Sequence, residues 1–311
     1  VKLTEGQALY YEDTCLAYVA DTTTYQTNAT DYGEKIFLTT ETEPLQYRFP
    51  WDLFRLNDTW LRLDFQLLTA GRTSAPISAT NTLIGTDIFL EEGASVEGCI
   101  INTRTGPVYA GRKVEMMEGC LVRGPLALCD EAVLKMGAKV YGATTLGPGC
   151  KAGGEMNNVV FQANSNKAHD GFLGNAVIGE WCNLGADTNN SNLKNTYEMV
   201  KVWSESEGRF VSTGLQFCGL IMGDHSKCGI NTMFNTGTVV GVACNIFGAG
   251  FPRQFIPSFS WGGPQGIMEY QLIKAVDTAT RVFARRGMDW TDADTALLQA
   301  VFDMTRSQRK S

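Results

Sequence analysis

The stretch CLVRGPLALCDEAVLKMGAKVYGATTLGPGCKAGGEM, residues 120–156, repeats apolar and small residues every six positions. The repeated positions are Cys120, Leu126, Ala132, Ala138, Thr144, Cys150 and Met156. A hexapeptide with one inward residue and turn-forming glycines can make one flat side of a three-sided coil. One coil cannot bury its inner face alone, so coils stack and share a continuous core. The period of six predicts a parallel β-helix rather than a β-sandwich, whose strands alternate with period two.

The same repeat continues on both sides of this stretch. It starts at Ile84 and keeps its register to Ala168, which places Asn102 and Gln162 at inward positions. A second run contains Met222, Cys228, Phe234, Val240 and Ile246. The changes of phase predict two inserted loops, 169–176 and 193–219, and residues 200–211 within the second are expected to form a β-hairpin. We expect the β-helix to occupy residues 82–250.

The two ends of the chain do not follow the repeat. Residues 1–47 contain short strand-like runs, and Pro50 opens a helix that leads into a linker, so 48–81 is expected to be helix and linker. The apolar face of that helix is expected to contain Leu53, Trp60, Leu63 and Leu67. Residues 251–311 are expected to form an extended segment and helices at 267–285 and 292–304. The predicted fold class is mainly β, with a small N-terminal α/β remnant and C-terminal helices.

The composition narrows the functional classes. The 311 residues include 26 Lys and Arg against 33 Asp and Glu, which gives a net charge of −7. An acidic chain without a concentrated basic face binds nucleic acid poorly, so no nucleic-acid partner is expected. No apolar run approaches the roughly 18 residues of a membrane-spanning helix, so no membrane partner is expected.

The numbers and spacing of the cysteines and histidines argue against a metal site and a disulfide-bonded fold. The nine cysteines form no C-x-x-C pair, which argues against a zinc site and a complete disulfide framework. Free thiols in a reducing cytoplasm are therefore expected, and the predicted localisation is cytoplasmic. The two histidines, His169 and His225, are too few for a site that needs three histidine ligands from one chain, and no metal is expected.

One segment departs from the apolar repeat where its phase changes. Residues 165–174 read SNKAHDGFLG, so Lys167 and His169 interrupt the pattern, and asparagines gather at 189–192. A histidine base with nearby lysine and asparagine donors suits acyl transfer from a thioester to an amine or hydroxyl. We interpret His169 as the catalytic base, with a turn-stabilising histidine as the alternative. His225 lies in a regular repeat turn, so a structural or cofactor-adjacent role is expected for it.

The same segment resembles a known family. KAHDGFLG (167–174), followed by IGEWCNLGADT (178–188), resembles the acetyltransferase domain of bifunctional glucosamine-1-phosphate N-acetyltransferase/N-acetylglucosamine-1-phosphate uridyltransferases, in particular the Bacteroidetes-type variant labelled a sugar nucleotidyltransferase. Similar motifs occur at 50–54, 136–142, 185–195, 214–219, 222–241 and 257–263. The resemblance implies a left-handed β-helix that assembles as a homotrimer and binds acetyl-CoA in clefts between neighbouring coils.

The resemblance also implies roles for individual residues. The family's general base corresponds to His169, its aromatic sugar-site residue, usually tyrosine, to Phe172, and its sugar-contacting asparagines to Asn183 and Asn192. A phosphate-binding arginine corresponds to Arg123. The family's phosphate-binding lysine is replaced near Asn157, which leaves Lys167 or Lys194 for that role. Acetyl-CoA contacts are implied at Gly185, Ala186, Gly229, Ile230, Gly248 and Ala249, with Lys227 and Arg253 for its phosphates.

These inferences lead to one expected function and two alternatives. The expected function is acetyl-CoA-dependent N-acetylation of an amino-sugar phosphate, with glucosamine-1-phosphate as the acceptor, in UDP-N-acetylglucosamine synthesis. One alternative is acyl transfer to another sugar or nucleotide sugar, and the other is a non-catalytic β-helix scaffold or part of a sugar nucleotidyltransferase. Residues 1–47 resemble the tail end of a nucleotidyltransferase-like domain. No glycine-rich nucleotide loop precedes residue 82, so nucleotide transfer is not expected from this chain alone.

Overall fold

The computed structural model describes residues 2–20, 34–38 and 44–310. They belong to two compact units that divide between Arg48 and Phe49. In the first unit, β1 (Gln7–Tyr11) pairs antiparallel with β2 (Thr14–Tyr18) and parallel with β3 (Glu34–Phe37). Ala8 and Tyr10 are buried and their β1 neighbours are half-buried, as expected of a strand with one inner face.

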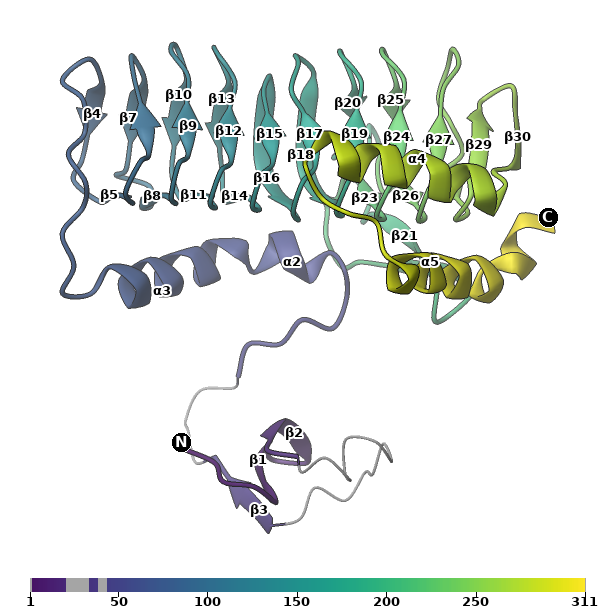
Figure 1. Cartoon of the computed structure of the whole chain (residues 1–311), viewed down its shortest axis with the longest axis horizontal. Coiled ribbons are helices and arrows are strands. Elements are labelled where there is room, and N and C mark those ends of the chain that lie inside the picture. Colours follow the sequence, from purple (N-terminus) through teal and green to yellow (C-terminus); the bar gives the residue numbers. More distant parts are fainter. Residues whose placement is uncertain (1, 21–33, 39–43, 311) are drawn as a thin grey trace. The chain divides into compact units, whose positions relative to one another are not determined.

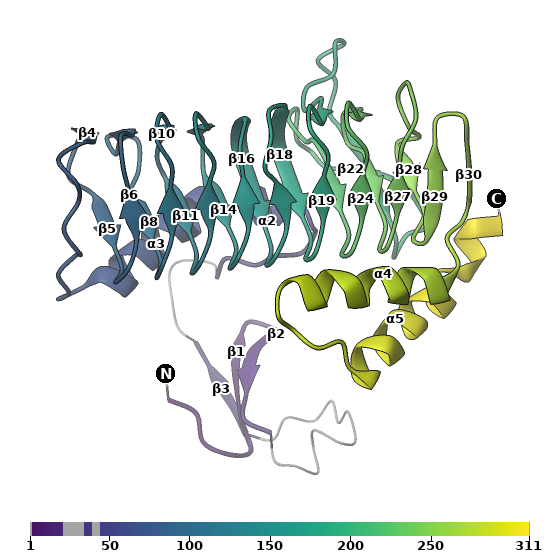
Figure 2. The ribbon, with the colours of Figure 1, turned by 45° about the horizontal axis from the view of Figure 1, so that its top comes forward.

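The second unit is a parallel β-helix, as the period of six predicted (Figure 1). Its strands form three faces, and Figure 2 shows the strands of successive coils side by side. Face 1 contains β4 (Thr82–Ile84), β7 (Ile100–Asn102), β10 (Leu121–Arg123), β13 (Lys139–Tyr141), the first halves of β16 (Glu155–Phe161) and β18 (Phe172–Ile178), β20 (Asn189–Asn190) and β25 (Met233–Phe234).

In each coil the chain passes from face 1 to face 2 and then to face 3. Face 2 contains β5 (Ile88–Leu90), β8 (Val108–Ala110), β11 (Leu126–Leu128), β14 (Thr144–Leu146), the second halves of β16 and β18, β23 (Ile221–Met222), β26 (Val239–Val240) and β28 (Phe255–Ile256). Face 3 contains β6 (Ser95–Val96), β9 (Glu115–Met116), β12 (Val133–Leu134), β15 (Lys151–Ala152), β17 (Asn166–Lys167), β19 (Asn183–Leu184), β24 (Lys227–Cys228), β27 (Asn245–Ile246) and β29 (Ser260–Gly263).

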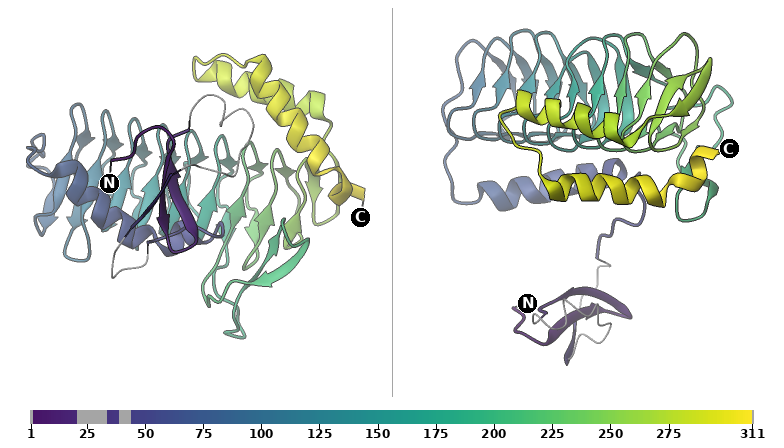
Figure 3. Two further views of the ribbon diagram at one scale, coloured as in Figure 1. Left: turned by 90° about the horizontal axis from the view of Figure 1, so that it is seen from below. Right: turned by 45° about the vertical axis from the view of Figure 1, so that its right-hand side comes forward.

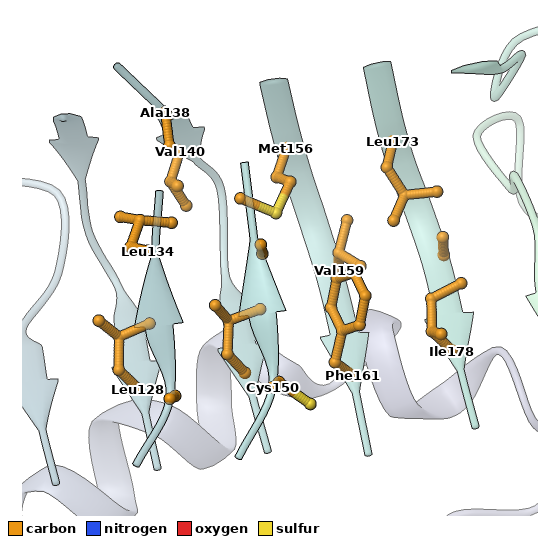
Figure 4. Close-up of a cluster of buried hydrophobic side chains, with 14 of the residues drawn as sticks. Leu128, Leu134, Ala138, Val140, Cys150, Met156, Val159, Phe161, Leu173 and Ile178 are labelled. Atoms are coloured by element: carbon orange, nitrogen blue, oxygen red, sulfur yellow. The ribbon is translucent and has the colours of Figure 1, made fainter. Parts of the chain in front are cut away.

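Stacked inward side chains fill the coil and form its core. Figure 4 shows the central part, which contains Leu128, Leu134, Ala138, Val140, Cys150, Met156, Val159, Phe161, Leu173 and Ile178. Each of these side chains is at most 1% exposed. Because the strands of successive coils pair in register, equivalent positions form columns parallel to the coil axis. All nine cysteines are free thiols.

The phase of the repeat differs from the predicted one after Ala152. The inward positions step by four residues from Ala152 to Met156 (156 − 152) and by five from Met156 to Phe161 (161 − 156). The first short step lies at the turn between β15 and β16, and the second lies within β16, which, like β18, runs without a break around the corner between faces 1 and 2. Gln162 is therefore exposed, although the predicted register placed it inside. Asn102, also predicted to lie inside, is half-buried because its neighbour Ile101 is the inward residue of β7. Residues 169–176, predicted as an inserted loop, form a turn and the start of β18.

The long insertion leaves the coil after β20 and rejoins it at β23. It contains the predicted hairpin, in which β21 (Lys201–Ser204) pairs antiparallel with β22 (Arg209–Ser212). The coil also continues past Gly250, where the sequence analysis placed its end, through β28 and β29. There β30 (Gly266–Glu269) adds an antiparallel strand to face 3.

Helices pack on faces 2 and 3 of the coil. Helices α2 (Asp52–Arg55) and α3 (Asn57–Thr69) lie along face 2, where Phe54 and Leu61 are buried (Figure 1). The predicted apolar face of this segment was wrong in part, because Leu63 and Leu67 are 47% and 77% exposed. Helix α4 (Leu272–Arg285) crosses β24 and β27 of face 3, followed by α5 (Asp292–Met304) and the 3₁₀ helix η1 (Arg306–Lys310) (Figure 3).

Helix α4 starts later than predicted because β30 occupies the preceding residues. In the described ranges, none of the helices combines the length and the apolar character needed to cross a bilayer.

Candidate active site

The turn between faces 3 and 1 carries the predicted base. Residues 168–171 connect β17 to β18, and the His169 side chain is exposed on this turn. Both neighbouring coils fix the backbone of the turn. A Cβ on Gly154 would lie only 2.9 Å from the Cα of Asp170, and the Asp187 N–H donates a hydrogen bond to the Asp170 carbonyl at 3.0 Å. His169 therefore sits on a well-supported corner of the coil.

The predicted acyl-CoA residues stack at the same corner in the following coils. The register of β17, β19 and β24 places His169, Ala186 and Ile230 in one line, which we name the corner column. Gly185 and Gly229 precede the last two of these residues. A Cβ on Gly185 would lie 2.5 Å from the carbonyl carbon of Gly229, so this spacing requires glycine. The Ile230 side chain is 71% exposed beside this backbone. Four predicted cofactor residues thus share one edge with His169.

The remaining predicted cofactor residues lie at the end of this column or away from it. Gln265 packs against Gly248, and its Nε2 donates to the Ala249 carbonyl at 2.7 Å. Lys227 lies on face 3 beneath α4, where burial lowers the pKa of its ammonium. Arg253 is exposed beside a cavity of about 180 Å³ lined by β28, β30 and η1. The structure therefore does not bring Lys227 and Arg253 to the corner column.

Phe172 and Asn192 lie together on face 1, directly after the His169 turn. Gly174 leaves room for both. A Cβ at Gly174 would lie 2.5 Å from the Cζ of the Phe172 ring and 2.7 Å from the Asn192 Nδ2. The Asn192 amide also donates to the Asn175 Oδ1 at 2.8 Å, which fixes its orientation. An aromatic ring and an oriented amide therefore both lie over Gly174, directly after the turn that carries the predicted base.

Two further asparagines hold this part of face 1 in place. The Asn189 Oδ1 accepts a hydrogen bond from the Phe172 N–H at 2.7 Å. The buried Asn190 amide accepts from the Gly174 N–H at 2.8 Å and donates to the Gly174 carbonyl at 2.9 Å. The asparagine cluster is visible in the sequence, but no individual role was predicted for Asn189 or Asn190. Their contribution is to position Phe172 and Gly174, which only the register of neighbouring coils reveals.

The other predicted substrate residues are dispersed. Asn183 is exposed on face 3, on the opposite side of the His169 turn from Phe172. Lys194 is half-buried and lines a polar cavity of about 320 Å³ formed by the start of the long insertion and the next coil. Arg123 lies on β10, and the strand order β10-β13-β16-β18 places it three strands from Phe172. At about 4.8 Å per strand, this separation is about 14 Å along the coil.

A cation nearer to Phe172 was missed by the sequence analysis. The registers of β13, β16 and β18 place Lys139, Glu155 and Phe172 in one outward column of face 1. Lys139 is exposed and lies two strands from Phe172. The sequence spacing between Lys139 and Phe172 does not predict this alignment, because the coil after Ala152 is shorter than the repeat.

Lys167, predicted to bind the substrate's phosphate, lies inside the coil. Its side chain is 0% exposed, and the Nζ donates to the carbonyls of Gly153 at 3.2 Å and His169 at 2.8 Å. Burial lowers the pKa of its ammonium to about 8, against the opposing effect of Asp170 and Asp187. An enclosed ammonium held by two carbonyls does not reach a phosphate outside the coil, so this position does not suit the predicted role.

His225 has a different environment from His169. Its ring stacks with Trp181 and Phe283, at centroid distances of 6.4 and 6.2 Å, and meets Trp290 edge-on at 5.7 Å. The Nδ1 is buried and has no hydrogen-bond partner among the described residues. Burial lowers the pKa of the imidazole to about 4, with a further contribution from Lys227. This aromatic cluster beneath α4 fits the structural role expected for His225.

Parts of this chain are similar in sequence to known proteins. Residues 1–73 match the model of a family described as sugar nucleotidyl transferase. The chain is 36% identical over 90 residues to the bifunctional protein GlmU of Methanocaldococcus jannaschii, a match that covers 29% of this chain and 21% of that protein. It is 30% identical over 157 residues to the bifunctional protein GlmU of Stenotrophomonas maltophilia, covering 45% of this chain and 34% of that protein.

The matched region thus spans between about a fifth and a third of the length of these relatives. Among solved structures, an Arabidopsis UDP-N-acetylglucosamine acyltransferase aligns with 75% of this chain and 94% of that chain, at 14% identity and a TM-score of 0.32. The curated relatives and the family match confirm that this chain resembles the bifunctional acetyltransferase/uridyltransferase proteins, as inferred from its sequence.

Proposed function

We propose that the β-helix unit is an acetyl-CoA-dependent N-acetyltransferase whose acceptor is an amino-sugar phosphate, with glucosamine-1-phosphate as the first candidate. The observation that carries this proposal is the corner column, where the exposed His169 shares an edge with the stacked backbone of Gly185–Ala186 and Gly229–Ile230. The similarity to bifunctional proteins of the GlmU type supports the same reaction class.

The residues of the corner column suit a CoA thioester. Gly185 lets its backbone pack directly against Gly229 of the next coil, and the exposed Ile230 side chain offers an apolar contact beside this stacked backbone. Bound there, acetyl-CoA supplies an activated acyl group next to His169. His169 accepts a proton from the acceptor amine as the nitrogen attacks the thioester carbonyl. The amide forms as the carbon–sulfur bond breaks, and the proton on His169 is returned to the departing thiolate.

Phe172 and Asn192 are proposed to hold the acceptor sugar. The ring of Phe172 offers an apolar face to a sugar ring, and the Asn192 amide can bond a hydroxyl. Lys194 follows Asn192 by two residues and lines a polar cavity, so it is the cation proposed to meet the phosphate. Asn183 and Arg123 lie too far around or along the coil to join this group. We propose that they act across the interfaces of the homotrimer that the family resemblance implies.

The test measures free thiol released from acetyl-CoA with and without glucosamine-1-phosphate, in wild type and His169→Ala. Acceptor-dependent release in wild type and its loss in His169→Ala, with unchanged acetyl-CoA affinity by calorimetry, is the expected result. Asp170→Asn, next to His169 on the same exposed turn, serves as the matched control and should retain most of the activity. Release that persists in His169→Ala would remove this residue from the mechanism.

A second candidate is acyl transfer to a different amino or hydroxyl sugar, such as a nucleotide sugar. Phe172 and Asn157 favour it, because they stand where the resembled family has a phenol and a phosphate-binding lysine. A panel of sugar phosphates and nucleotide sugars in the same assay separates the two candidates. Turnover restricted to nucleotide sugars would replace glucosamine-1-phosphate as the acceptor, and an absence of both acetyl-CoA binding and turnover would favour a scaffold.

A further inference from the structure

Lys167 occupies a place in the coil that an apolar side chain takes in the neighbouring coils. The strand pairings align it with Ala152 of β15 and, through β19, with Leu184 and then Cys228. These three neighbours are buried members of the core, and Lys167 itself has no exposed surface. It is therefore a charged side chain at an inward position of an otherwise apolar column.

The two hydrogen bonds of this ammonium join successive coils. The Nζ donates to the Gly153 carbonyl, which follows β15, and to the His169 carbonyl, which lies on the exposed turn after β17. Backbone bonds of the same region run from the Gly153 N–H to the Lys167 carbonyl at 2.7 Å and from the Asp187 N–H to the Asp170 carbonyl at 3.0 Å. The side chain of Lys167 thus adds a link that ends on the residue proposed as the base.

Packing alone does not account for a lysine at this position. Burying an ammonium requires removing its hydration, and replacing a buried charge with an apolar side chain of similar volume is often neutral or stabilising. The opposite charges near it, Asp170 and Asp187, are both exposed and offset only part of this desolvation. Its distinctive contribution is therefore to the geometry of the turn rather than to the stability of the core.

We propose that Lys167 is a positioning residue for His169. Its buried ammonium ties the His169 carbonyl to the Gly153 carbonyl of the preceding coil and so holds the imidazole toward the corner column. This inference rests on the proposed acyl transfer for its kinetic consequence, but the mechanical link can be measured without turnover.

The kinetic test is a double-mutant cycle of Lys167→Met and His169→Ala. Lys167→Met keeps the length of the side chain and removes its donors. We expect kcat to fall about tenfold to a hundredfold while the KM for acetyl-CoA changes less than twofold, because displacement of a catalytic group affects the chemical step. In the His169→Ala background, Lys167→Met should cause no further loss. Leu134→Met, at an inward position two coils earlier on face 3, controls for changes in core packing.

The stability of the same variants separates positioning from packing. Positioning predicts that the melting temperature of Lys167→Met at pH 7 equals or exceeds that of wild type. A kcat loss of the same size in both His169 backgrounds, or a loss matched by lower stability, would overturn the proposal.

Amide hydrogen exchange provides the readout that does not depend on activity. Loss of the link should speed exchange at the Asp187 N–H, which bonds to the turn, and leave the Gln162 N–H, which bonds to Ile178 on face 2, unchanged. Unchanged exchange at Asp187 in Lys167→Met would overturn the positioning role even in an active enzyme. Faster exchange there in a protein without acetyl transfer would support the link while the proposed function failed.

Discussion

Two histidine–lysine pairs flank strands of face 3 in opposite orders, and their surroundings differ completely. Lys167 lies in β17 and His169 follows this strand by two residues. In the second pair the order is reversed, because His225 precedes β24 by two residues and Lys227 lies in it. In both pairs the lysine Nζ donates to the carbonyl of the histidine two residues away, at 2.8 and 2.9 Å respectively. The local hydrogen bond is therefore the same in the two regions.

The position of each residue within the coil causes the difference. Side chains alternate along a strand, so Lys167 points into the core, whereas Lys227, one residue earlier in its strand, points outward beneath α4. His169 follows its strand onto the exposed corner before face 1, whereas His225 precedes its strand and packs against Trp181 and Phe283. The corner of the coil, rather than the residue pair, decides whether the histidine is available for chemistry.

The largest expected effect is the difference in kcat between variants of the two histidines. His169→Asn should lower kcat for acetyl transfer by about 10²–10⁴, because it removes a general base. His225→Asn should change kcat by less than about threefold. Asparagine tolerates the positive φ of 60° at position 225, which limits backbone strain in this variant. Initial rates at saturating donor and acceptor provide the measurement, and similar losses in both variants would contradict the assignment.

The buried side chains of His225 and Lys167 should make the free energy of unfolding depend on pH, His225 on the acid side and Lys167 on the alkaline side. His225 has its pKa lowered from 6.5 to about 4, so the folded state binds fewer protons than the unfolded chain between these values. Its stabilising contribution is complete above pH 6.5 and is lost as pH falls to 4, by about 3 kcal/mol at most. Lys167 has its pKa lowered from 10.5 to about 8, so stability should rise by a similar amount between pH 8 and 10.5.

Urea unfolding at successive pH values checks both predictions. His225→Phe should flatten the acid side of the stability profile, and Lys167→Met should flatten the alkaline side. If either variant keeps the slope of wild type, the corresponding group is not the source of that slope.

A smaller effect is expected from alanine substitutions at two glycines of the corner column, Gly185 and Gly229, whose surroundings differ. Gly185→Ala would force a Cβ to within 2.5 Å of the Gly229 carbonyl carbon, whereas the nearest atom to a Cβ in Gly229→Ala would be the Phe247 Cβ at 3.5 Å, an ordinary van der Waals distance. We expect Gly185→Ala to lower the free energy of unfolding by about 1–3 kcal/mol and to weaken acetyl-CoA binding. Gly229→Ala should stay within about 0.5 kcal/mol of wild type. Calorimetric binding and urea unfolding measure both effects, and equal behaviour would contradict the proposed spacing of the column.

The smallest expected effect concerns the acceptor. Phe172→Tyr adds a phenol beside the Asn192 amide, where the resembled family has tyrosine. The KM for glucosamine-1-phosphate should fall about two- to tenfold with kcat unchanged, because one added hydrogen bond contributes about 0.5–1.5 kcal/mol. Asn189 bonds the backbone of residue 172 and not its side chain, so the variant should keep the same backbone support. A rise in KM would place the acceptor elsewhere.

The sequence predicted the repeat well where its step is constant. Residues 120–152 keep a period of six, and the hairpin of the long insertion and helix α5 form at the expected residues. The prediction failed at β16 and β18, which turn the corner without a break, because the shortened steps of these coils change the phase of the repeat.

The candidate site was partly predictable for the same reason. His169, Phe172 and Asn192 were selected from a motif, and the structure places the last two on either side of Gly174, directly after the turn that carries the first. The direction of Lys167 was not predictable, because the shift of phase decides whether it points inward or outward. The burial of Lys227 depends on α4, which starts more than forty residues later in the chain.

The most direct test of the corner column is a titration of ¹⁵N-labelled protein with CoA, followed by amide chemical shifts. We predict saturable shifts at Gly185, Ala186, Gly229 and Ile230, with the amides beside Arg253 unchanged. Shifts centred on the Arg253 cavity, or an absence of shifts at concentrations that support acetyl transfer, would contradict the proposal that the acyl donor lies along the edge headed by His169.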